Sequence, residues 1–170
     1  SGGHTQPQIG PLVFDPGSQL NLNSPNCGSD HTSLCMNNKI AVNQNIIFND
    51  TDITGSGIIV ATNKITIKQN STITGDITLI AKSIEINSSS LGNSSLFNGA
   101  NGSVVIYTED GGIISNSNNV AGLIINYDSN NSGTFIINNS SISGAILNYG
   151  MNFSINNNSM IEGSVVSNYL

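Results

Sequence analysis

The sequence predicts an all-β chain folded as a right-handed parallel β-helix, a β-solenoid of about six short coils behind an irregular N-terminal cap. The first observation behind this prediction is a repeat: four similar stretches begin with glycine, continue with aliphatic residues and end on tyrosine. Their glycines stand 20, 22 and 19 residues apart, a period typical of stacked coils. The stretches are GSVVIY (102–107), GLIINY (122–127), GAILNY (144–149) and GSVVSNY (163–169).

Composition is the second observation. The chain has 170 residues, the length of one domain, and only 8% of them are charged, against roughly a quarter in an average domain. Asn, Ser, Thr and Gly take the place of the charged residues, while runs rich in Ile and Val argue against disorder. Such runs between Asn/Ser/Gly clusters predict many short strands joined by tight turns.

Residues 1–35 have no period and contain all four prolines, so we expect them to form the irregular cap that covers the first coil. Cys27 and Cys35 lie within this segment, at a spacing that suits a disulfide. Free thiols and a zinc site with His31 are the alternatives, and zinc would need two further ligands. A disulfide favours an oxidising location outside the cytosol.

Residues 36–170 are predicted to form the solenoid body, with three short strands in each coil of about 20 residues. Within 57–75 and 75–91, aliphatic residues alternate with polar ones, as in strands that bury one face. A shift of 19 residues places Ile58, Val60, Ile65 and Ile67 on Ile77, Leu79, Ile84 and Ile86, which we expect to fill equivalent core positions.

The coil from Gly75 to Gly102 is longer than the others. Its extra residues form a polar loop with two apolar side chains, Leu96 and Phe97. Insertions into repeats map to loops on one face, often the binding face, so these two residues are a candidate binding loop; a tolerated surface loop is the alternative.

Tyrosine and asparagine recur at the expected corners of the coils. Asn accepts left-handed backbone geometry, and stacked Asn side chains can pair between coils, so a structural role explains their number. The tyrosines would form a ladder if they occupy one corner. It would be either a structural stack or an aromatic edge for a glycan or a protein partner. The candidate edge comprises Tyr107, Tyr127, Tyr149 and Tyr169.

Catalytic and metal-binding patterns are weak in this sequence. Asp50 and Asp52 could form the carboxylate pair of a polysaccharide hydrolase or, with Asn49, bind calcium. They faintly resemble the Asn-Thr-Asp motif of polygalacturonases, but the other motifs of that family are absent. No Ser-His-Asp arrangement is credible with only His4 and His31, so we expect no catalytic residue, metal or cofactor.

Charge and hydropathy limit the partners. The net charge is −6, there is no arginine, and four scattered lysines cannot supply a phosphate-binding surface, which argues against nucleic acid. No stretch is apolar and long enough to span a membrane. The opening SGGHTQPQ (1–8) looks like a cleaved or truncated start, from which a signal peptide or anchoring helix would have been removed.

Two parts of the body resemble known families. The stretch GDITLIAKSIEINSSSL (75–91) resembles the coils of filamentous haemagglutinin-type secreted adhesins. The run from 133 to 170 resembles the β-helical repeats of bactofilins and of pilin-like surface proteins with a β-solenoid head. The resemblance implies surface attachment, a pilus-associated role or polymerisation, without a cofactor.

From these observations we expect a non-catalytic extracellular module of a bacterial surface adhesin or pilus-associated protein. Its partner would be a surface glycan, a protein receptor or other surface subunits. The alternatives are a polysaccharide hydrolase centred on Asp50 and Asp52, and a structural subunit that associates end to end.

Overall fold

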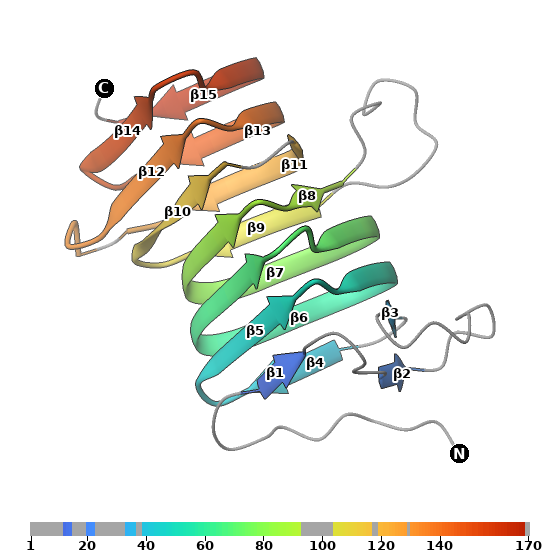
Figure 1. Cartoon of the computed structure of the whole chain (residues 1–170). Helices are drawn as coiled ribbons and strands as arrows, with labels where there is room; N and C mark the ends of the chain where they lie inside the picture. The colour runs from blue at the N-terminus through green and yellow to red at the C-terminus, as the bar shows by residue number, and fades with distance from the viewer. Residues whose placement is uncertain are drawn as a thin grey trace.

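The computed structural model shows an all-β chain whose parallel strands stack as a β-solenoid of about six turns, as the sequence predicts (Figure 1). Strands β1 and β4 lie at one end of the rod, and β14 and β15 lie at the other. Among the described residues there is no helix that could cross a membrane. The structure describes residues 12–14, 20–22, 33–36, 39–92, 104–116, 119–128 and 130–168, and for the first three of these segments only the backbone.

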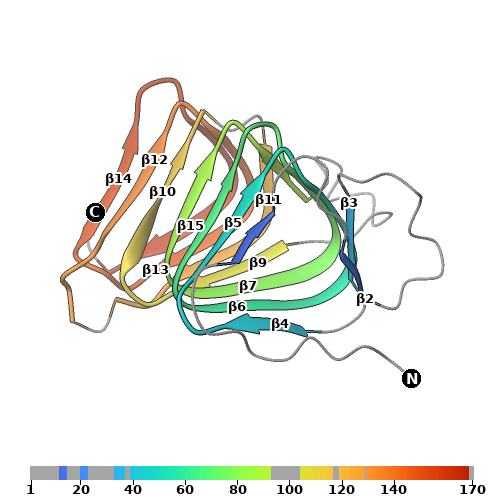
Figure 2. The ribbon, with the colours of Figure 1, turned by 60° about the horizontal axis from the view of Figure 1, so that its bottom comes forward.

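Three parallel sheet faces enclose the interior (Figure 2). Face A holds the glycine-led strands that the repeat predicts, and each neighbouring pair is in parallel register. Its members are β4 (Lys39–Val42), the middle parts of β6 (Asp52–Lys68) and β7 (Thr72–Asn87), β9 (Val104–Thr108), and the later parts of β11 (Asn119–Asn126), β13 (Ser141–Asn148) and β15 (Met160–Ser167).

Face B follows face A in every coil, and face C leads into the next coil. Face B contains β1 (Leu12–Phe14), β5 (Asn45–Asn49), the ends of β6 and β7, β10 (Gly111–Ser115), β12 (Thr134–Asn138) and β14 (Asn152–Asn156). Face C contains β2 (Leu20–Leu22), β3 (Ser33–Met36), β8 (Ser90–Leu91) and the first residues of β6, β7, β11, β13 and β15.

The core is a set of aliphatic columns that run along the rod. Every second residue of a strand points inward and stacks on its counterpart in the next coil, because parallel strands in register place equivalent side chains above one another. Two buried phenylalanines, Phe48 and Phe135, fill the interior behind face B. The inward column of face A is Ile40, Ile59, Leu79, Ile106, Ile124 and Ile146, all at most 1% exposed.

The predicted superposition of successive coils is half confirmed. Ile65 pairs with Ile84, and Ile67 with Ile86, at the expected shift. The equivalence expected for Ile58 and Val60 is wrong: Ile59 pairs with Leu79, while Ile58 faces outward and is 41% exposed.

The two coils are offset by 20 residues, not 19, through this whole part of the pair, from Asp52 opposite Thr72 to Ala61 opposite Ala81. A shift of one residue moves a side chain to the other face of a strand. An irregularity between Ala61 and Lys64 restores the expected register in face B.

Glycine marks the passage from face C to face A in the last three copies of the repeat, as predicted, whereas the alignment of the first copy is wrong, because Val104 and not Gly102 pairs with Gly122. Gly122, Gly144 and Gly163 pair in register with positive φ values of 147°, 137° and 143°. A Cβ on Gly144 would lie 2.0 Å from the carbonyl oxygen of Gly122, so only glycine allows the coils to stack here.

The segment expected to form the cap contributes short strands to the same sheets. β1 pairs with β5, and β2 pairs with β3, which in turn pairs with β6. Cys27 and the side chain of Cys35 lie outside the described residues, as do Leu96 and Phe97 of the long loop. The disulfide and the candidate binding loop therefore stay predictions.

A pocket at the corner between faces A and B

The corner between faces A and B, here called the A–B corner, differs from coil to coil. Lys82 alone makes the turn in β7, and Glu109 and Asp110 make the next one, between β9 and β10. The turn between β11 and β12 then widens to residues 127–133, and the following turn shortens again to 149–151. The wide turn was missed by sequence reasoning, although the longer spacing between Gly122 and Gly144 signals it.

A buried polar ladder supports this corner from inside. Asn126 is 1% exposed, and its Oδ1 accepts hydrogen bonds from Thr108 Oγ1 at 3.0 Å and from the backbone nitrogen of Gly111 at 3.1 Å. Its Nδ2 donates to Oδ1 of Asn148 at 2.7 Å, and Nδ2 of Asn148 donates to Oγ of Ser167 at 3.0 Å. The expected pairing of stacked Asn between coils is confirmed at this position.

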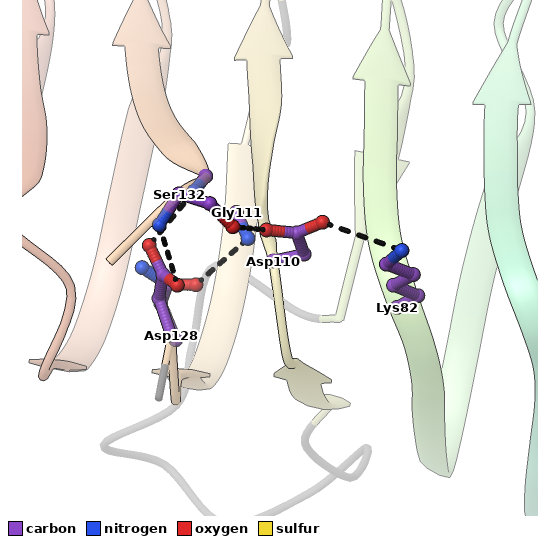
Figure 3. Close-up of polar contacts among 7 residues, drawn as sticks. Lys82, Asp110, Gly111, Asp128 and Ser132 are labelled. Atoms are coloured by element: carbon purple, nitrogen blue, oxygen red, sulfur yellow. Dashed lines mark hydrogen bonds and ion pairs between the residues drawn. The ribbon is translucent and has the colours of Figure 1, made fainter. Parts of the chain in front are cut away.

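Asp128 shapes the wide turn (Figure 3). Its carboxylate is buried, with Oδ1 accepting from the backbone nitrogen of Ser132 at 3.1 Å and Oδ2 from that of Gly133 at 2.9 Å. The turn lies so close to the preceding coil that a Cβ on Gly133 would stand 2.2 Å from the carbonyl oxygen of Asp110. The wide turn is therefore fixed against its neighbour.

Side chains link this turn to two earlier coils (Figure 3). Ser132 Oγ donates to Oδ1 of Asp110 at 2.8 Å, and Nζ of Lys82 lies 3.6 Å from Oδ2 of the same carboxylate. Lys82 and Asp110 are 56% and 30% exposed, so their ion pair adds little stability. The arrangement instead orients polar groups at the surface.

These groups surround a pocket of about 300 Å³. Two aromatic rings and several hydrogen-bonding groups line it, which gives it both an apolar surface and directional polar contacts. Three coils contribute to it, so no single repeat carries the whole pattern. The lining residues are Lys82, Tyr107, Glu109, Asp110, Tyr127, Asn130 and Ser132.

The tyrosines that the sequence suggested for one edge do not all lie together in the structure. Tyr127 and Tyr149 form the expected contact, with ring centroids 5.9 Å apart in an edge-to-face arrangement. Tyr107 does not continue this ladder, because it pairs with Ile125 within face A, whereas Tyr127 follows the end of β11. Tyr169 lies outside the described residues.

The acidic pair of the alternative hydrolase hypothesis lies elsewhere. Asp50 is exposed at the corner between faces B and C, with a φ of 44°. Asp52 begins β6 on face C and accepts a hydrogen bond from Thr72 Oγ1 at 2.5 Å. Within the described ranges, no three His, Cys, Asp or Glu side chains gather in a way that could hold a metal ion.

The fold and this pocket define the chain as a parallel β-solenoid with a small amphipathic pocket on one corner. No family model, curated protein or solved structure matches it.

Proposed function

We propose that this chain is a non-catalytic extracellular module of a bacterial surface adhesin or pilus-associated protein, and that it binds a surface glycan in the A–B corner pocket. The observation that carries the proposal is the meeting of Tyr107 and Tyr127 with carboxylate, amide and hydroxyl groups in one small pocket. The families that the sequence resembles support the surface location.

A sugar ring suits such a pocket because it has an apolar face of C–H groups and an equatorial set of hydroxyl groups. Tyrosine supplies a flat apolar surface with a polar tip. The side chains of Asn130 and Ser132 can donate and accept hydrogen bonds, and Glu109 can accept them. A volume of about 300 Å³ is at the lower end for ligand pockets and corresponds to one or two sugar units.

Charge narrows the class of sugar. Lys82 is opposed by Glu109 and Asp110, so the pocket has a net negative charge. Like charges repel at short range, which disfavours uronic and sialic acids. Neutral hexoses and amino sugars are therefore the ligands that we expect.

Several features favour binding over hydrolysis. Asp110 is already hydrogen-bonded to Ser132 and paired with Lys82, so its carboxylate has a positioning role. Hydrolysis needs two carboxylates on opposite sides of one glycosidic bond. Glu109 and Asp110 are instead neighbours in one turn, and Asp52 is engaged with Thr72.

A glycan array probed with the labelled protein tests the proposal. We expect binding to neutral or amino sugars, which Tyr127→Ala weakens about tenfold, a loss near 1.4 kcal/mol and typical of an aromatic contact. Tyr149→Ala is the matched control, because this ring contacts Tyr127 and is similarly exposed but does not line the pocket.

Two further variants separate glycan binding from the hydrolase alternative. If the chain only binds glycans, Asp50→Asn and Asp52→Asn should leave glycan binding unchanged, since Asn accepts the backbone conformation found at Asp50. Release of reducing ends from a polysaccharide, abolished in these two variants, would replace binding by catalysis. An array on which no glycan binds would also contradict the proposal.

A further inference from the structure

Face A is apolar on its outer side as well as on its inner side. In a sheet with one face in water, apolar and polar residues alternate along each strand, whereas parallel strands buried on both sides are continuous apolar runs. The strands of face A have such runs, for example VVIYT in β9 and the LII of β11. Their sequence thus has the pattern of a sheet that is covered on both sides.

Two outward columns make up this surface. Because the strands are in register, the outward side chains stack in straight lines along the rod. Most of them are half-buried by their neighbours, while Ile58 and Val166 are 41% and 58% exposed. One column is Lys39, Ile58, Thr78, Val105, Leu123, Ala145 and Ser164, and the other is Ala41, Val60, Ile80, Tyr107, Ile125, Leu147 and Val166.

The outer side of the other two faces is more polar, although face B has outward isoleucines such as Ile113 and Ile136. On face B, Lys64 forms an ion pair with Glu85, and the last outward position is Asn or Ser in most coils. On face C, the first outward position is polar in all coils but the last: it is occupied by Asp52, Thr72, Ser90, Asn119 and Ser141, and then by Met160. Among the described residues, an outward column that is apolar or aromatic in every coil, from Ala41 to Val166, is therefore found only on face A.

We propose that face A packs against face A of a second copy of this chain, forming a face-to-face dimer. Charge supports a second copy as the occupant. The chain has a net charge of −6, which opposes self-association, yet among the residues of the two columns only Lys39 is charged. Two copies can approach through this face without bringing carboxylates together.

The size of the face sets the strength of the dimer. Seven strands about 4.8 Å apart span about 29 Å along the rod, and five residues of a strand span about 16 Å, giving about 460 Å² per copy. The two copies together bury about 900 Å², which is slightly less than the roughly 1,000 Å² of a stable interface. We therefore expect a reversible dimer that dissociates on dilution.

Sedimentation equilibrium of the whole chain over a range of protein concentrations tests this interface. The first variant, Ile58→Gln/Ile125→Gln, places two amides on face A and should raise the dissociation constant at least about tenfold, since burying an unpaired amide costs more than 1.4 kcal/mol. The matched control, Ile113→Gln/Ile136→Gln, changes two outward isoleucines of face B and should leave it unchanged. Glutamine is used because it creates no like-charge pair with Lys39 or Glu85.

The milder variant Ile125→Thr keeps a β-branched residue in β11 and guards against loss of folding. It should still weaken the dimer, while circular dichroism shows the native strand signal. A chain that is monomeric at every concentration would overturn the proposal. So would self-association that survives both face A variants but is lost in Met160→Lys, since the 59% exposed Met160 lies on the last strand and would indicate end-to-end contact.

Discussion

The A–B corner and the corner between faces B and C, here called the B–C corner, both turn the chain from one sheet face to the next, but they do so with different residues. At the B–C corner a residue with positive φ is followed by a buried Ser or Thr in coil after coil, as at Asn70 and Ser71 or Asn139 and Ser140. The hydroxyl group binds the backbone of its own turn: Ser71 Oγ donates to the carbonyl oxygen of Lys68 at 2.7 Å. The A–B corner has no such constant unit.

This difference separates structure from function within one rod. A corner whose residues repeat is explained by the need to turn the chain and satisfy its buried backbone groups. The A–B corner varies from coil to coil and contains a wide turn fixed by Asp128. Turning the chain and satisfying its backbone groups do not require such a variation. Loops that vary on a rigid scaffold are where binding residues gather.

The largest effect is expected from Asn126→Leu, at the base of the A–B corner. It leaves the hydroxyl of Thr108, the buried nitrogen of Gly111 and Oδ1 of Asn148 without their partner. We expect the free energy of unfolding to fall by about 3 kcal/mol, because an unsatisfied buried group costs about 1–3 kcal/mol. Denaturant titration measures the loss, and Asn156→Leu on the exposed side of face B is the control, with little change expected.

Ser71→Ala tests the B–C corner and should have a smaller effect. Its hydroxyl accepts from the backbone nitrogen of Thr51 at 3.0 Å as well as donating to Lys68. We expect a loss of about 2 kcal/mol in the same titration. A loss larger than that of Asn126→Leu would show that the repeated corner, and not the variable one, contains the more costly polar network.

Asn139→Ala should have the smallest effect, about 1 kcal/mol, because alanine is strained at the φ of 47° observed there. Asn139→Gly is the matched variant: it loses the same exposed side-chain contact to Asn116 but accepts the backbone conformation. The two melting temperatures should therefore differ. Equal melting temperatures would remove the conformational explanation of Asn at this corner.

The fold could be predicted from the sequence because its cause is repeated. Glycine at the passage from face C to face A, Ile in the core and Asn at positive φ recur with the period of the coil. The same assignment of strands and turns is therefore supported by several coils independently. Gly122, Gly144 and Asn139 occupy the positions that this period gives them.

The site could not be predicted in the same way. The pocket is built from residues of three different coils, and the turn at 127–133 has no counterpart in its neighbours. The register error at Ile58 arises because the turn after Ala61 is one residue longer than the turn at Lys82, and a one-residue shift moves a side chain to the other side of its strand. Tyr107 is misplaced for a different reason: Val104, and not Gly102, pairs with Gly122, so the first copy of the repeat is displaced by two residues.

The most direct test of the glycan site is a titration of the isotopically labelled protein with a glycan that binds on the array, monitored through backbone amide shifts. We expect changes at Tyr107, Asp110 and the turn at 127–133, and none at the B–C corner residues Ser71 and Ser140. Shifts concentrated around Asp50 and Asp52, with the A–B corner unaffected, would contradict this expectation.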